Sequence, residues 1–316
     1  MHVQVYLRLD PSMLAQPNDA TPVLQHLIAK GSVGNSTQVF EAALCQAFGV
    51  EKQQDWPAAA LSWLGEGNSP ENDFWLYADP VHLQLQRDHF TLSLPVPLPL
   101  THTESEALLA TLNRHFAQDG LMFCTGASGQ WYMRQTNPSD IAFSFPDQAA
   151  GRDVRDFLPR GATAEQWRRL LNEIQMLLHE HPVNLAREER GQSAINSLWF
   201  SGAGPLPVSP QRQSGTVVAD HPLARGLANW SGRNALALPP DFALSDEKDV
   251  LLVPEDGQEG LAQWLQHIRV WLQTRKVKHL TLEIFIHDRH LQATIKPRDL
   301  FKFWRKPQPL AAYFSW

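Results

Sequence analysis

Residues 178–207 read LHEHPVNLAREERGQSAINSLWFSGAGPLP, and three kinds of segment follow one another in them. A helical pattern stops at Pro182, because proline lacks the N–H group that a helix interior needs. The charged run over 187–190 that follows is predicted to form a loop. The apolar segment around Trp199 is predicted to be a buried strand before a glycine- and proline-rich exit. A helix, a connection and a strand in this order are typical of an α/β chain.

Helices and strands alternate on both sides of this stretch. A capping-box pattern at Thr163–Gln166 opens the preceding helix, and a second one at Thr103–Glu106 opens another. Apolar residues at helical spacing predict further helices over 22–30, 37–48 and 259–274. Alternating apolar residues predict strands at 3–9, within 74–94 and 121–134, and at 197–200, 216–219, 235–238, 250–253, 280–286 and 291–295. The last two strands form a hairpin with a tight turn at His287-Asp288.

This alternation predicts the fold class. Short strands between amphipathic helices indicate an α/β fold with a mostly parallel sheet and helices on both of its faces. The hairpin-rich block 74–160 interrupts that rhythm and is predicted to be an inserted α+β subdomain. The predicted core then consists of residues 1–73 and 161–316.

Composition excludes several classes of protein. Apolar residues make up 43% of the 316 residues, which is enough for a sizeable core. A net charge of −6 argues against binding to nucleic acid or anionic membranes, since both need basic patches. We expect neither a signal peptide nor a membrane-spanning segment, because the N-terminus lacks a basic region before a long apolar one and no uncharged stretch approaches membrane-spanning length. Cys45 and Cys124 lie in apolar segments, so we expect buried thiols and a cytoplasmic protein.

Two residues near the N-terminus are candidates for chemistry. Asp10 ends the first strand, and ligands collect at that edge of an open α/β sheet, so its carboxylate could hold a metal ion. The alternative is an Asp-Pro turn. Ser36 precedes the predicted helix 37–48, where a hydroxyl could act as a nucleophile or help to bind phosphate. The alternative is that Ser36 or Thr37 simply caps the helix.

The charged run supplies candidates for ligand binding. Arg187 and Arg190 could form a bidentate clamp on an anion, with Asn184 close by in the sequence. The alternative is a solvated run in which the arginines pair with Glu188 and Glu189. The histidines show no spacing typical of zinc ligands, and the sequence contains no P-loop, no GxGxxG after a strand and no GxSxG.

Several segments resemble archaeal-type, cofactor-independent phosphoglycerate mutases, which belong to the alkaline phosphatase superfamily. They are INSLWFSGAGPLP (195–207), TPVLQHLIAKGSVG (21–34), the block 100–135 and GTVVADHPLARGLANWSGRNALALP (215–239). A narrower resemblance is to bacterial RpfE-type regulatory proteins. It rests on DFWLYADPVHLQLQRD (73–88), LLNEIQMLLHEHPVN (170–184) and NSLWF (196–200). The resemblance implies an alkaline-phosphatase-like α/β fold with an inserted subdomain.

The chain departs from these enzymes at their catalytic motifs. Enzymes of the superfamily use two divalent metal ions and a serine or threonine nucleophile. Asp10 is similar to their first aspartate, but Pro11 replaces the glycine that follows it; Ser36 is a weak counterpart of their nucleophile and lacks the adjacent acid. Near 280–290, where they carry an aspartate-to-histidine ligand motif, the chain reads LTLEIFIHDRH. A two-metal site that lacks several ligands loses most of its activity.

The resemblance and these departures together imply a non-catalytic, phosphoglycerate-mutase-like protein with a binding or regulatory role in the bacterial cytoplasm. The alternative is a divergent metal-dependent phosphoglycerate mutase or phosphatase, which would need Mn²⁺, Mg²⁺ or Zn²⁺. Under the first interpretation no cofactor is expected. The expected partner is an anionic metabolite that bears a phosphate or a carboxylate, held by Arg187 and Arg190 near Asp10. No nucleic-acid or membrane partner is expected, and the question of a protein partner stays open.

Overall fold

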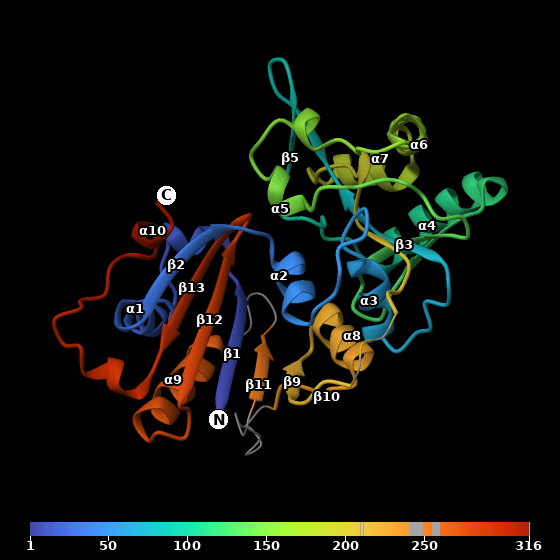
Figure 1. The fold of residues 1–316 in the computed structure, drawn as a ribbon. Coiled ribbons are helices and arrows are strands. Elements are labelled where there is room, and N and C mark those ends of the chain that lie inside the picture. Colours follow the sequence, from blue (N-terminus) through green and yellow to red (C-terminus); the bar gives the residue numbers. More distant parts are fainter. Residues whose placement is uncertain (209, 211, 240–248, 255–259, 316) are drawn as a thin grey trace. The chain divides into compact units, whose positions relative to one another are not determined.

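The computed structural model describes residues 1–208, 210, 212–239, 249–254 and 260–315 (Figure 1). The chain divides into two compact units, residues 1–44 with 209–316, and residues 45–208. We refer to them as unit 1 and unit 2 and describe each by itself. None of the helices in the described part of the chain combines the length and the apolar character that crossing a membrane requires.

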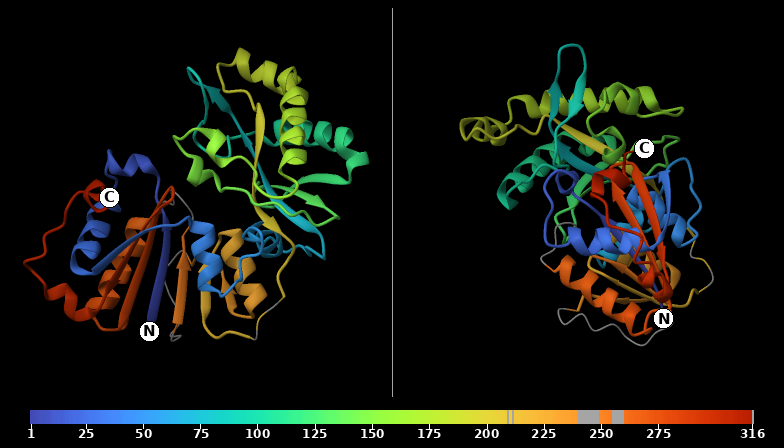
Figure 2. Two further views of the ribbon diagram at one scale, coloured as in Figure 1. Left: turned by 45° about the horizontal axis from the view of Figure 1, so that its top comes forward. Right: turned by 90° about the vertical axis from the view of Figure 1, so that its left-hand side faces the viewer.

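Unit 1 contains a seven-stranded sheet with the order β10-β9-β11-β1-β12-β13-β2, whose strands lie side by side in Figures 1 and 2. Its strands are β1 (His2–Arg8), β2 (Ser32–Thr37), β9 (Thr216–Ala219), β10 (Asn234–Leu236), β11 (Asp249–Val253), β12 (His279–Ile286) and β13 (Arg289–Ile295). The five strands from β10 to β12 are parallel, and β13 and β2 are antiparallel to their neighbours. The predicted mostly parallel sheet is confirmed.

Helices cover both faces of this sheet, as predicted. The helices of unit 1 are α1 (Thr21–Lys30), α2 (Phe40–Ala47, which runs into unit 2), α8 (Pro222–Ser231), α9 (Leu261–Gln273) and α10 (Leu310–Tyr313), with 3-10 turns at Pro11–Leu14 and Pro297–Phe301. On one face, alternate β1 residues such as Val3 and Val5 join α1 and α9 in a hydrophobic cluster. On the other face, Phe40 of α2 packs edge-on against Phe285 of β12. The start of the predicted helix 259–274 at Glu259 lies outside the described residues.

One predicted helix begins later than expected, and a strand that was not predicted precedes it. Residues 37–48 were expected to be helical, but Ser32–Thr37 form β2 and the helix α2 begins only at Phe40. Backbone pairing explains the difference, since β2 runs antiparallel to β13 and Ser36 lies opposite His290. All six β2 residues are exposed and mostly small or polar, so the segment carries no alternating pattern that would have predicted a strand.

Unit 2 is built on an antiparallel four-stranded sheet with the order β6-β7-β3-β8. The strands of unit 2 are β3 (Phe74–Val81), β6 (Leu121–Thr125), β7 (Trp131–Gln135) and β8 (Ser197–Gly204), with a separate hairpin of β4 (Leu83–Leu85) and β5 (Phe90–Leu92). Its helices are α3 (Ala58–Gly65), α4 (His102–Phe116), α5 (Pro146–Ala149), α6 (Ala164–His179) and α7 (Pro182–Glu189), with 3-10 turns at Ala117–Asp119 and Val154–Phe157. Trp199 is buried in β8, as predicted.

The inserted unit is larger than the predicted block 74–160. Strand β8 pairs with β3, so the stretch around 197–204 belongs to unit 2 and not to the parallel sheet. Helix α3 packs on β3 and β8, which brings residues before 74 into the same unit. The predicted boundaries at 73/74 and 160/161 therefore need correction, because strand pairing and not the change in sequence rhythm decides which segments belong together.

The prediction of a loop over the charged run 187–190 is wrong. Residues Pro182–Glu189 form the helix α7, which contains most of that run. Pro182 occupies the first turn, where a missing N–H is tolerated, and the His181 ring nitrogen accepts a hydrogen bond from the backbone N–H of Val183 as the N-cap. A proline that ends one helix can thus begin the next.

Candidate functional site

The carboxyl ends of the parallel strands in unit 1 are the first place to look for a site, because open α/β sheets bind ligands at that edge. Asp10 follows β1 there, as the sequence predicts. Its Oδ1 accepts the backbone N–H of Ser12 at 2.7 Å and so caps a short 3-10 turn. These hydrogen bonds with Ser12 lower the pKa of the Asp10 carboxyl. The side chain is exposed and does what an Asp-Pro turn requires.

The described residues do not fit a metal centre. Nowhere among them do three or more histidine, cysteine, aspartate or glutamate side chains gather closely enough to hold a metal ion. Asp10 therefore has no described co-ligands, and its predicted metal-binding role stays a prediction. The described donor set does not fit a divalent ion.

An ion pair and an aromatic ring lie close to the end of β1. Arg8, the last residue of β1, forms an ion pair with Glu41 of α2. The Arg8 guanidinium also lies 5.0 Å from the ring centroid of Phe40, the first residue of α2. The Phe40 ring in turn packs edge-on against the ring of His221, with 5.2 Å between centroids. This end of β1 thus carries a cation, and the helix beside it opens with a buried apolar ring.

His221 belongs to the same arrangement. Desolvation lowers the pKa of its imidazole to about 3, and the positive charge of Arg8 acts in the same direction. The ring is therefore neutral at any physiological pH. A neutral imidazole beside an arginine adds no positive charge to this part of unit 1.

Ser36 lies in a hydrogen-bonded network that was not predicted from the sequence. It is on the exposed edge strand β2, and its Oγ lies 2.8 Å from Nδ1 of His290. The opposite ring nitrogen of His290, Nε2, lies 2.7 Å from Oε2 of Glu283. The second carboxylate oxygen of Glu283 accepts the side-chain N–H of Gln292 at 2.8 Å. Glu283 and His290 are buried, and the His290 ring stacks on Phe285.

A hydroxyl, an imidazole and a carboxylate in this order are the parts of an activated nucleophile. With its proton on Nε2, His290 donates to Glu283 and can accept the hydroxyl proton of Ser36 at Nδ1. The same bonds also tie β12, β13 and β2 to one another across the sheet face. Both ring nitrogens of His290 and both carboxylate oxygens of Glu283 are engaged in this way. These hydrogen bonds therefore stabilise the edge of the sheet whether or not the Ser36 hydroxyl reacts.

The predicted ligand-binding residues lie in unit 2, where each has partners of its own. Asn184 is buried; its amide donates to the carbonyls of Leu178 and Ile195 and accepts the N–H of Ile195. Asn184 thus fixes the passage from α6 through α7 into β8. Its predicted contact with a ligand stays a prediction, since the described bonds use its side-chain amide within the unit.

Arg187 and Arg190 converge on Glu104 of α4. Arg187 is buried and lies 3.2 Å from Glu104 Oε2, while Arg190 pairs with Oε1. Arg187 also donates to the carbonyls of Ser193 and Pro99. These three acceptors engage Nε and Nη1 of Arg187 within unit 2. The anion-binding role of the two arginines stays a prediction. The alternative pairing with Glu188 and Glu189 is wrong, since the partner is Glu104.

Burial alone would raise the pKa of the Glu104 carboxyl. Hydrogen bonds from Thr101 and from Arg190, together with the charge of Arg187, lower that pKa below its ordinary value. Glu104 therefore stays ionised in the neutral range, as the partner of two cations must.

The comparisons with known proteins give one consistent result. The chain is 27% identical over 143 residues to the 2,3-bisphosphoglycerate-independent phosphoglycerate mutase of Methanosarcina acetivorans, which covers 43% of this chain and 36% of that protein. It is 31% identical over 105 residues to the enzyme of the same name from Methanothrix thermoacetophila, which covers 32% of this chain and 27% of that protein. The chain thus spans about a third of the length of the curated relatives that it matches. No family model matches the chain.

Among solved structures, the cofactor-independent phosphoglycerate mutase of Thermoplasma acidophilum aligns with 99% of this chain and 94% of that chain, at 16% identity and a TM-score of 0.45. The sequence matches show that the chain is homologous, at low identity and over part of its length, to archaeal-type cofactor-independent phosphoglycerate mutases. None of these comparisons bears on the narrower resemblance to RpfE-type proteins, which stays a prediction.

Proposed function

We propose that the chain is a non-catalytic relative of the cofactor-independent phosphoglycerate mutases, with a binding or regulatory role in the bacterial cytoplasm. The observation that carries the proposal is the environment of Arg8. In the related superfamily the metal ions make the nucleophile and neutralise the phosphoryl charge. Here the end of β1 carries an arginine, which repels divalent cations and is paired with Glu41.

The start of α2 supports the same conclusion. A helix N-terminus attracts phosphate and is a suitable place for a hydroxyl nucleophile. The first two residues of α2 are Phe40 and Glu41, a buried ring and the carboxylate that pairs with Arg8. Ser36 lies on the edge strand before this helix and bonds to His290, so its hydroxyl belongs to a different part of the sheet.

Metal uptake and turnover together test the proposal. We expect the purified protein to bind less than one equivalent of Mn²⁺, Zn²⁺ or Mg²⁺ in calorimetric titrations. We also expect it to interconvert 3- and 2-phosphoglycerate, and to hydrolyse p-nitrophenyl phosphate, far more slowly than about 1 s⁻¹, the low end of ordinary enzymes. A cooperative thermal transition of the same sample establishes that it is folded.

The alternative, a divergent metal-dependent mutase or phosphatase, makes the opposite expectation. Two equivalents of bound Mn²⁺ together with turnover above about 1 s⁻¹ would establish it and refute the non-catalytic proposal.

A further inference from the structure

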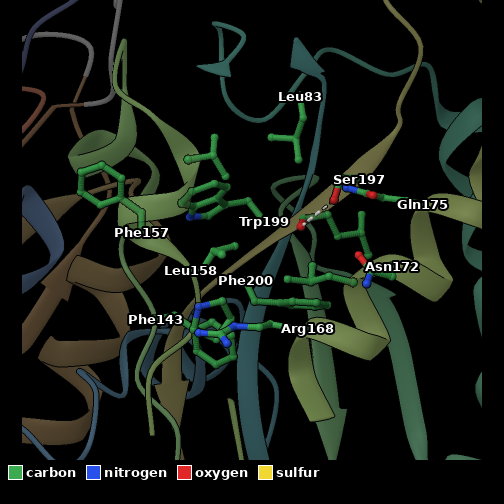
Figure 3. Close-up of a pocket in the computed structure, with 14 residues that line it drawn as sticks. Leu83, Phe143, Phe157, Leu158, Arg168, Asn172, Gln175, Ser197, Trp199 and Phe200 are labelled. Atoms are coloured by element: carbon green, nitrogen blue, oxygen red, sulfur yellow. Dashed lines mark hydrogen bonds between the residues drawn. The ribbon is translucent and has the colours of Figure 1, made fainter. Parts of the chain in front are cut away.

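Unit 2 contains a cavity of about 230 Å³ between helix α6, strand β8 and the segment that follows the turn at 154–157 (Figure 3). Most of its wall is apolar, and Trp199 and Phe143 supply aromatic surface. An apolar cavity of about 150 Å³ is enough to bind benzene, so this one has room for a single ring and a short substituent. All the residues that line it belong to unit 2.

One side of the cavity is polar. Arg168, Asn172 and Gln175 are four and then three residues apart on α6, so they share one face of the helix. Figure 3 shows them extending from α6 on the same side of the cavity, with Arg168 reaching towards Phe143. Among the described residues, none of the three side chains makes a hydrogen bond or an ion pair. Two other polar groups of the wall are in use, since the Trp199 indole N–H donates to the carbonyl of Ser144 at 2.8 Å and the Ser197 hydroxyl donates to the carbonyl of Leu198 at 3.4 Å.

The charge on the wall has one sign. Arg168 is the charged residue among those that line the cavity, and no carboxylate lies beside it there. The next arginine along α6, Arg169, instead pairs with Glu165 one turn earlier on the helix. An arginine at the rim of an apolar cavity matches an anionic group at the end of an apolar body, and its planar fork matches a carboxylate.

We propose that this cavity binds a small monocyclic carboxylate. The ring lies among Trp199, Phe143 and Leu158, and the carboxylate is bound by Arg168 with the amides of Asn172 and Gln175 as further donors. A second hollow, of about 680 Å³, is lined in part by the same Leu83, Asn172 and Gln175. The residues that line the cavity all belong to unit 2 and include none from the end of β1, so the test does not depend on whether unit 1 is catalytic.

Titration with 3-phenylpropionate tests the proposal, with 3-phenylpropionamide as the uncharged match. For a ligand of this size we expect a Kd between about 1 µM and 1 mM by calorimetry, and a shift of the Trp199 indole N–H signal in NMR spectra. We expect the amide to bind at least about tenfold more weakly, because it lacks the charge that Arg168 recognises.

Two variants on α6 form a matched pair. Arg168→Ala removes the cation at the rim, and we expect it to weaken 3-phenylpropionate about tenfold or more. Arg169→Ala removes an exposed cation of the same helix that does not line the cavity, and we expect it to leave the Kd unchanged. A third variant, Leu171→Trp, fills the cavity and should abolish the shift of the Trp199 signal while a cooperative thermal transition is retained.

Three results would overturn the proposal. The first is no heat and no Trp199 shift at about 10 mM ligand, well above the expected Kd. The second is equal weakening by Arg168→Ala and Arg169→Ala, which would reduce the effect to the net charge of the helix. The third is an amide that binds as tightly as the acid, which would leave a purely apolar cavity with no preference for anions.

Discussion

At the scale of single residues, Glu104 connects parts of unit 2 that are far apart in the sequence. Its Oε2 accepts the backbone N–H of Thr101 at the start of α4, and its two oxygens also meet Arg187 and Arg190 of the α7 segment. The Arg187 and Glu104 side chains are only 4% and 11% exposed, whereas that of Arg190 is 52% exposed. The two ion pairs with the same carboxylate should therefore differ in what they contribute.

We expect Arg187→Ala to lower the free energy of unfolding of unit 2 by roughly 3–5 kcal/mol, because it leaves a buried carboxylate without its best-shielded counter-charge. Arg190→Ala is the matched control. Its side chain is half exposed and its ion pair is screened by water, so we expect a cost of about 1 kcal/mol or less. Urea unfolding of both variants measures the difference; equal costs would show that burial does not separate the two pairs.

Asp55 permits a prediction about pH. It is buried and accepts the backbone N–H groups of Trp56, Phe143 and Ala203. Burial nevertheless raises the pKa of its carboxyl to about 6, with the three hydrogen bonds and the charge of Lys52 acting in the other direction. Between pH 3.8 and about 6 the folded protein holds a proton that the unfolded chain has lost. The contribution of Asp55 to stability is therefore greatest below pH 3.8 and is lost as the pH rises through about 6.

A ¹³C NMR titration measures this directly. We expect the Asp55 carboxyl signal to have its midpoint near pH 6, while the exposed Asp10, whose pKa is lowered by Ser12, titrates below the ordinary value for aspartate. A midpoint for Asp55 below about 4 would mean that its three N–H donors outweigh the loss of solvation.

The hydrogen-bonded chain at Ser36 shows which residue contacts the sequence could have predicted. A two-residue turn at His287-Asp288, which was predicted, places Phe285 opposite His290 and Glu283 opposite Gln292, as the structure has them. The contacts among Glu283, His290 and Gln292 thus follow from the hairpin register, whereas the bond of Ser36 to His290 depends on the pairing of β2 with β13, which was not predicted. The pairing of Arg187 with Glu104 does not, because the two residues are 83 positions apart and no local pattern connects them.

At the scale of elements, helix starts show how local hydrogen bonds decide boundaries. The predicted capping box at Thr103–Glu106 is two residues late, because the box consists of Thr101 and Glu104 and the helix starts at His102. Thr163 is the N-cap of α6 as predicted, but its hydroxyl makes no capping bond and donates to the carbonyl of Asp140 instead. Segments rich in hydroxyl and acidic residues contain the capping-box spacing more than once. The sequence alone therefore does not decide at which of two nearby residues the helix starts.

The two threonines at the start of α4 test this assignment. We expect Thr101→Ala to cost about 1 kcal/mol and to speed amide exchange at Glu104, whose N–H loses its acceptor. Thr103→Ala, inside the first turn, should leave both quantities nearly unchanged, because Thr103 is exposed and alanine is a better helix former. The opposite ranking of the two variants would restore the register that the sequence predicts.

Longer elements were more predictable than short ones. The helix predicted over 22–30 is α1 with one residue added, and the hairpin strands 280–286 and 291–295 are β12 and β13. Their periodic apolar residues face the core, so pattern and burial agree. The exposed strand β2 and the charged helix α7 were missed, since backbone pairing stabilises the first and buried Asn184 and Arg187 the second.

At the scale of the whole molecule, the sequence predicts the fold class but not where the units begin and end. The alternation of strands and amphipathic helices predicts a mostly parallel sheet, which unit 1 contains. The boundaries of unit 2 depend on β8 pairing with β3, more than a hundred residues earlier in the chain. A single sequence carries no signal for antiparallel pairing over such a separation, because the apolar pattern of a strand is compatible with a place in either of the two sheets.

The two units should also differ in whether they can fold alone. Unit 2 is one continuous segment, and its main hydrophobic cluster, which includes Leu76, Leu112, Phe123, Ile174 and Phe200, consists entirely of its own residues. Unit 1 is assembled from two segments, 1–44 and 209–316, and its core mixes both, since Val3 and Val5 join the same cluster as Leu280 and Leu282. A continuous segment with a core of its own meets the ordinary description of an independent domain.

We therefore expect a protein consisting of residues 45–208 to fold by itself, with a cooperative thermal transition and a near-ultraviolet circular dichroism signal from its buried tryptophans. A protein consisting of residues 209–316 is the control. It lacks β1, the strand that joins β11 to β12 in the sheet, so its apolar strands have no central partner and we expect no cooperative transition. A broad, non-cooperative melt of 45–208 with retained helix signal would instead indicate a molten state. That result would mean that the core of unit 2 needs the rest of the chain, although all its described members lie within 45–208.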